Sequence, residues 1–103
     1  MNNVTIKLGQ NANENQQLWY SANPKHIWIH LSSFPSSHVI IEDENPDKQL
    51  IDFAAKLCKM NSKYKNLKNI KYSVTNCGNL IRGDSIGEVE FKSNRKVKDY
   101  PIY

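Results

Sequence analysis

The amino-acid sequence predicts an α+β fold: a mostly antiparallel sheet with one long helix packed on it and a short N-terminal helix. Short apolar or alternating segments, separated by turn residues, indicate the strands. One longer segment repeats its apolar residues with helical periodicity. The length of 103 residues suits one domain that spans residues 1–103.

Seven short segments are expected to be strands. Clusters of Gly, Asn, Ser and Pro bound them, as is typical of the turns between antiparallel strands. The expected strands span residues 4–8, 27–31, 38–41, 70–74, 80–82, 86–92 and 97–100.

A short polar helix is expected over residues 11–19. Asn11 can cap it, and Glu14 follows three positions later, which is the spacing of a capping box.

The long helix is expected over residues 46–62, with Asn45 as its cap and Pro46 in its first turn. One half of its helical wheel is apolar and is formed by Leu50, Ile51, Phe53, Ala54, Leu57, Cys58 and Met60.

Residues 27–41 carry the most informative pattern. Two apolar strands flank a Ser/Pro turn, and His30 and His38 stand at equal distances from Phe34. In an antiparallel pair centred on Phe34 the histidines are cross-strand neighbours, and Trp28 lies on the same face. An aromatic ring and two imidazoles beside hydroxyl residues indicate a contact surface.

The charge is distributed unevenly along the chain. The net charge of +4 combines −3 in residues 1–53 with +7 in residues 54–103. A positive half favours an anionic partner, nucleic acid first. The best basic stripe consists of Lys56, Lys59, Lys63 and Lys65, although such a stripe is equally typical of a solvated helix face.

Several other classes of protein are disfavoured. No apolar run has the length of a membrane helix, and the N-terminus lacks the pattern of a secretory signal. Cys58 and Cys77 form no C-x-x-C motif, so we expect reduced thiols in a cytoplasmic protein. We expect no cofactor, since there is no Gly-rich phosphate loop. A zinc site is not expected either, because no cysteine lies close in sequence to His30 and His38.

Nucleophilic catalysis by a serine is also disfavoured. Ser37 directly precedes His38, and neighbouring residues on a strand point to opposite faces. An enzyme that acts on nucleic acid, with His30 or His38 as acid or base, is a weaker alternative.

A set of short motifs runs through most of the chain. They are Gly9–Ala12 with Glu14–Asn15, Ile27–His30, Pro35–Ile40, Phe53–Ala55, Ser62, Tyr72–Ser73 and Gly87–Val89. Together they resemble the NFACT-R domain, the RNA-binding module of the NFACT proteins of ribosome-associated quality control. The family usually has arginine where Gln10 stands and glycine where Ser36 stands. The other regions of NFACT proteins are missing, so a minimal stand-alone member is expected.

The resemblance implies a non-catalytic module that binds structured RNA, such as tRNA or ribosomal RNA, and that contacts the ribosome. The residues expected to contact RNA are Trp28, His30, Ser37, His38, Lys56, Lys59, Lys63 and Lys65. For Trp28, stacking on an unpaired base and filling of the core are both open. The alternative function is a protein-interaction module that docks a partner through the sheet face around Trp28.

Overall fold

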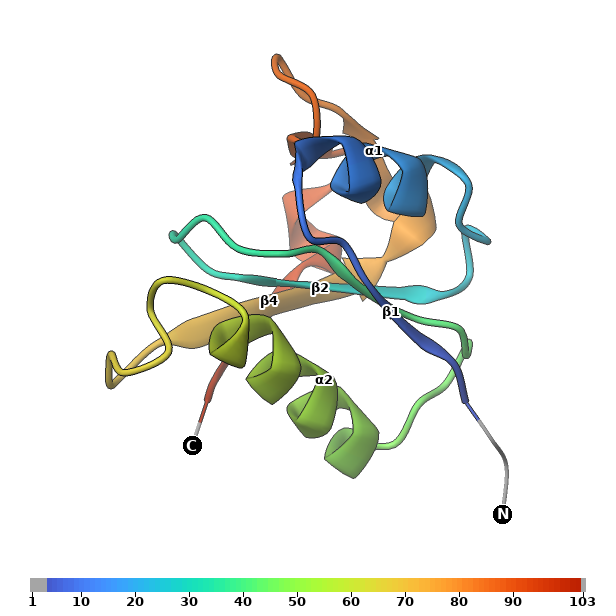
Figure 1. Ribbon diagram of the computed structural model, residues 1–103. Helices are drawn as coiled ribbons and strands as arrows, with labels where there is room; N and C mark the ends of the chain where they lie inside the picture. The colour runs from blue at the N-terminus through green and yellow to red at the C-terminus, as the bar shows by residue number, and fades with distance from the viewer. Residues whose placement is uncertain (1–3, 103) are drawn as a thin grey trace.

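The computed structural model describes residues 4–102. It contains a five-stranded sheet in the order β1-β3-β2-β4-β7 and a two-stranded sheet of β5 and β6, all antiparallel (Figure 1). The strands are β1 (Ile6–Leu8), β2 (Ile27–Leu31), β3 (Val39–Ile41), β4 (Lys71–Asn76), β5 (Leu80–Arg82), β6 (Val89–Phe91) and β7 (Lys98–Pro101). The helices are α1 (Ala12–Tyr20), α2 (Lys48–Met60) and the short 3₁₀ helices η1 (Cys77–Asn79) and η2 (Asn94–Lys96). The predicted α+β class is confirmed.

The large sheet is covered on both faces. Figure 1 shows α2 on one face and α1 on the other, where β5 and β6 join it. Because side chains alternate along a strand, Ile29 of β2 packs toward α2 whereas Trp28 packs toward α1. The sheet also separates the two thiols, since Cys58 is buried on the α2 side and Cys77 on the α1 side.

Small side chains bring α2 close to the sheet. Ala54, Ala55 and Cys58 are buried and form the stripe of the helix that faces β2 and β3. The predicted apolar half of this helix is therefore partly wrong. Phe53 is 54% exposed and Met60 63% exposed, because both lie on the side of the helix away from this stripe.

The N-terminus of α1 forms as its sequence predicts. The Asn11 side chain accepts a hydrogen bond from the Glu14 backbone N–H at 2.9 Å. The Glu14 carboxylate reaches back and accepts from the Gln10 N–H at 3.0 Å. In the usual capping box the backbone N–H of the cap residue donates to this carboxylate, whereas here the donor is the residue before the cap, Gln10.

The N-terminus of α2 differs from the prediction. The helix begins at Lys48 rather than at Pro46, and its cap is Asp47, whose carboxylate accepts from the Leu50 N–H at 2.8 Å. Asn45 lies in the preceding loop, where its backbone N–H donates to Asp43 at 3.0 Å. A carboxylate is at least as good a cap as an amide, so the residue nearer the helix takes the position.

The strand predictions hold in number and differ in length. Residues 86–92 shorten to β6 because residues 83–88 turn back on themselves: the Gly83 N–H donates to the Glu88 carbonyl at 2.9 Å. Residues 70–74 lengthen to β4, which pairs with both β2 and β7. Among residues 4–102, no helix is long and apolar enough to cross a membrane.

Replacing each candidate cap of α2 by alanine should affect stability to different extents. We expect Asp47→Ala to lower the free energy of unfolding by about 1 kcal/mol, because the first turn loses its side-chain acceptor. Asn45→Ala is the matched control and should change it by less than about 0.5 kcal/mol. Urea denaturation of both variants measures the difference, and a larger loss for Asn45→Ala would contradict the assigned cap.

Candidate nucleic-acid interface

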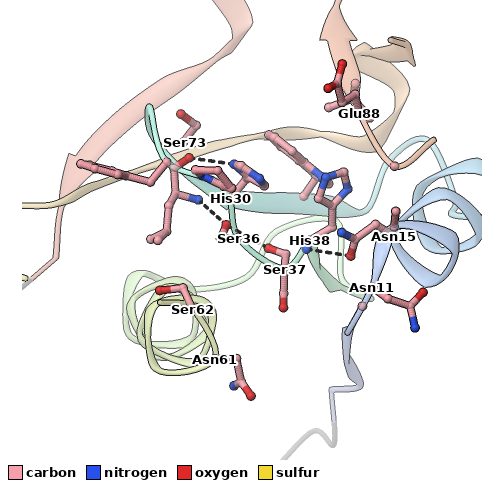
Figure 2. A pocket seen from close by; sticks show the side chains of 18 of the residues that line it. Asn11, Asn15, His30, Ser36, Ser37, His38, Asn61, Ser62, Ser73 and Glu88 are labelled. Carbon is pink, nitrogen blue, oxygen red and sulfur yellow. Dashed lines mark hydrogen bonds between the residues drawn. The ribbon is translucent and has the colours of Figure 1, made fainter. Parts of the chain in front are cut away.

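A cavity of about 780 Å³ opens on the α1 side of the sheet. Its walls come from four segments: the start of α1, the β2–β3 turn, the residues that follow α2, and the loop before β6 (Figure 2). The two predicted histidines line it, with His38 near the centre of the view.

The register of β2 and β3 brings the histidines together. Trp28 pairs with Ile40 and Ile29 with Val39, so the same register sets His30 opposite His38. The imidazole centroids lie 5.1 Å apart with their planes at 85°. The expected cross-strand pairing around Phe34 is confirmed.

Trp28 lines the floor of the cavity and is almost fully buried. Its side chain is 2% exposed and belongs to the core cluster beneath α1 and β5–β6. The indole stacks on His30 at 5.5 Å and 5°, and it meets His38 at 5.4 Å and Phe91 at 5.6 Å edge to face. Of the two roles left open for Trp28, the structure favours filling of the core, because protein side chains already occupy the surroundings of the ring.

Burial keeps both imidazoles neutral near pH 7. His38 is 3% exposed, and burial lowers its pKa to about 3, with a smaller contribution from repulsion by a charged His30. Burial also lowers the pKa of His30, although its hydrogen bond to the Leu31 carbonyl acts in the opposite direction. The wall of the cavity that these rings form is polar but uncharged.

Gly9 and Asn15 hold His38 in place through its backbone. The Asn15 side-chain oxygen accepts from the His38 N–H at 3.1 Å, and the Gly9 N–H donates to the His38 carbonyl at 3.0 Å. A Cβ at position 9 would clash with that same Asn15 oxygen. Glycine at this position thus leaves room for the Asn15 side chain to reach the His38 backbone.

Gly87 plays a similar part on the opposite wall. Its φ of +85° lies in the region that favours glycine, and its N–H donates to the Gln16 side chain at 3.0 Å. A Cβ at this position would lie 2.8 Å from the Ala12 carbonyl oxygen. These contacts dock the loop before β6 on the first turns of α1.

The Ser/Pro turn is fixed by hydrogen bonds to its neighbours. The Ser36 hydroxyl accepts from the Leu31 N–H at 3.2 Å, and the Cys58 thiol of α2 donates to the Ser37 carbonyl at 3.1 Å. Ser36, which replaces a glycine common in the NFACT-R pattern, thus has a structural contact here. The Ser37 side chain lines the cavity, as Figure 2 shows.

The predicted lysines separate in space. Lys63 lines the cavity, whereas Lys56, Lys59 and Lys65 do not. Lys56 is exposed near the Asp52 carboxylate, whose pKa it helps to lower after the larger effect of Lys48. The structure thus brings Trp28, His30, Ser37, His38 and Lys63 to one site and leaves the other three lysines outside its lining.

Several residues that line the cavity are not among those predicted to contact RNA. Asn61 and Ser62 follow the end of α2, and Asn11 and Asn15 belong to the start of α1 (Figure 2). These residues lie within or beside the short motifs of the sequence, and that position is the signal that could have identified them. Among residues 4–102, no group of three or more His, Cys, Asp or Glu side chains could hold a metal ion.

Comparison with known proteins connects this site to a family. The family model described as the NFACT protein RNA binding domain matches residues 1–93. The chain belongs to this family. In this NFACT RNA-binding domain the short motifs carry the glycines, amides and histidines that build the cavity.

Two relatives extend the comparison. The chain is 30% identical over 97 residues to the Rqc2 homolog RqcH of Bacillus subtilis (strain 168), covering 91% of the chain and 17% of RqcH. Its fold is similar to the C-terminal part of the fibronectin/fibrinogen-binding protein from Streptococcus suis, with a TM-score of 0.86 and 23% identity. That match covers 96% of the chain and 40% of the solved structure.

The buried imidazoles predict a pH dependence of stability. The folded-state pKa of His38, about 3, lies below its ordinary value of 6.5. Between these two pH values the imidazole is protonated in the unfolded chain and neutral in the folded chain. Stability should therefore rise between about pH 5 and 7, by at most about 1.4 kcal/mol per pH unit for each such proton. His30 contributes in the same direction. Urea denaturation across this range measures the slope.

The matched variants for this slope are His38→Gln and His26→Gln. Glutamine at position 38 removes the titrating group, so we expect a shallower slope. His26 lies on the turn before β2 and outside the cavity lining, so its variant controls for the loss of one imidazole elsewhere in the chain. Equal slopes for His38→Gln and wild type would contradict a buried neutral imidazole at this position.

Proposed function

We propose that this NFACT domain binds structured RNA, such as a tRNA or ribosomal RNA, without chemical catalysis, and that it serves translation or ribosome quality control. The observation that carries the proposal is the cavity itself, which family motifs build and which Lys63 borders. The relationship to RqcH supports the link to quality control. Such work takes place in the cytoplasm, with ribosomes as partners.

The lysines supply an electrostatic route to the RNA backbone. Lys59 stands in the last turn of α2, and Lys63 and Lys65 follow within six residues of it. Lys68 and Lys71 continue the series, and both are exposed. Contacts of this kind bind phosphates irrespective of sequence and weaken steeply as salt rises.

The histidines are poorly suited to acid–base catalysis. A general base works best when its pKa lies near the working pH, whereas burial lowers the pKa of His38 to about 3. In Figure 2, Glu88 lies on the loop before β6, apart from both histidines. These features favour a binding role over the weaker enzymatic alternative.

Docking of a partner protein on the sheet face around Trp28 is not supported. That face is covered by α1, β5 and β6, which bury Trp28 together with Trp19 and Leu80. A partner would have to displace this second core. We therefore prefer RNA binding to the sheet-face alternative expected from the sequence.

Charge reversal near the cavity tests the proposal. We expect Lys59→Glu combined with Lys63→Glu to weaken RNA binding, because attraction to phosphates is replaced by repulsion. The slope of log affinity against log salt should also become shallower, by about 0.7 on single strands for each phosphate that a lysine no longer neutralises. Electrophoretic titrations with tRNA, a single-stranded RNA and duplex DNA at two salt concentrations measure both quantities.

The control carries the same change of net charge elsewhere. Lys25 and Lys96 are exposed, and neither lines the cavity, so Lys25→Glu with Lys96→Glu should bind RNA more tightly than the first variant. Circular dichroism checks that both variants fold. If both double variants weaken binding equally, net charge alone is responsible and the proposed location fails.

A further inference from the structure

The cavity has almost no charge of its own. Lys63 and Glu88 are the charged side chains that line it, and they come from different walls. Hydroxyl, amide and imidazole groups supply most of the other polar lining, and apolar walls come from Phe34, Ile86 and Phe91. A phosphate is bound best by several cations or N–H donors. A planar, neutral ligand with hydrogen-bonding groups matches this lining better.

The tautomer of His30 is fixed by its own neighbour. Its Nδ1 lies 2.7 Å from the Leu31 carbonyl oxygen, and a carbonyl oxygen can only accept, so Nδ1 carries the proton. In the neutral ring, Nε2 is then an acceptor. His30 thus offers a hydrogen-bond acceptor to a site that its ring lines.

The tautomer of His38 is the opposite one. Its Nδ1 is buried without a hydrogen-bond partner among residues 4–102. A buried N–H without an acceptor is rarer in proteins than a buried acceptor without a donor, so the proton belongs on Nε2. His38 therefore offers a donor beside the acceptor of His30, with the two ring centroids 5.1 Å apart.

A donor next to an acceptor matches a nucleobase better than a phosphate. Each RNA base presents neighbouring donor and acceptor atoms on its Watson–Crick edge, which single-stranded RNA leaves free. A phosphate oxygen is only an acceptor near neutral pH and would oppose the lone pair of His30. The volume of about 780 Å³ lies within the usual range of about 300–1,000 Å³ for small-molecule sites.

We propose that this cavity binds one unpaired nucleobase, whose hydrogen-bonding edge meets the acceptor of His30 and the donor of His38, while the phosphates stay outside beside Lys63. The inference rests on the proposed RNA-binding function and names the part of the RNA that enters the cavity. Trp28 supports the site from below by stacking on His30, so the base is recognised by the imidazole edges rather than by the indole.

Nuclear magnetic resonance of the imidazole nitrogens tests this directly on the full chain. The free domain should show Nδ1–H for His30 and Nε2–H for His38. Titration with AMP, CMP, GMP or UMP should shift the ring signals of both residues. Ribose 5-phosphate, which carries the sugar and the phosphate without a base, should leave them unchanged at the same concentration.

A pair of variants supplies the matched control. His30→Phe keeps a ring that can stack on Trp28 and removes the acceptor, so nucleotide affinity should fall about tenfold. His26→Phe makes the same replacement outside the cavity and should leave affinity unchanged. Backbone amide shifts of the β2–β3 turn report binding in both variants. Equal affinity in His30→Phe and wild type would overturn the role of the acceptor.

The remaining outcomes separate this inference from the function on which it rests. Equal shifts with ribose 5-phosphate would show that sugar or phosphate occupies the cavity, which overturns the nucleobase assignment. Unshifted rings with every nucleotide, while tRNA still binds in electrophoretic titration, would also overturn it and leave RNA binding intact. Loss of RNA binding in the wild-type domain would reject both proposals.

Discussion

The pairing of β2 with β3 is the constraint on which the rest of the structure depends. With Trp28 opposite Ile40 and Ile29 opposite Val39, one face of the pair receives α2 and the other receives the imidazoles. A slip by one residue would exchange the two faces and send Ile29 into the cavity. Because both faces are covered, the core on each side holds this register in place.

The cavity is built at some cost to local stability. The buried Trp28 Nε1 has no hydrogen-bond partner among residues 4–102, and such an unpaired donor costs about 1–3 kcal/mol. Gly87 adopts a positive φ. The apolar cluster around Trp19 and Leu80 offsets these costs, since it anchors α1 and the β5–β6 hairpin to the sheet. A buried donor without a partner and a residue with a positive φ, both uncommon in proteins, thus lie at the candidate site.

Local sequence patterns predicted what local interactions decide. Equal spacing about Phe34 predicted the histidine pair, and Asn11 predicted the start of α1. The burial of Trp28 could not be predicted in this way, because its cover comes from α1 and from strands some 50 to 60 residues further along the chain. Asn45 and Asp47 are both good caps, so only the path of the acidic loop decides between them. Lys63 lines the cavity whereas the lysines of α2 do not, because the helix ends at Met60 and Lys63 lies in the loop that follows.

The four walls of the cavity lie far apart along the chain, from the start of α1 near residue 10 to the loop before β6 near residue 87. A molecule bound among them would contact, and so hold together, segments that lie almost 80 residues apart in the sequence. Thermodynamic linkage then ties occupancy to folding: a ligand at a hundred times its dissociation constant adds about 2.7 kcal/mol to stability. Occupied domains would consequently outlast empty ones in the presence of proteases, and resistance to digestion would itself report whether the cavity is occupied.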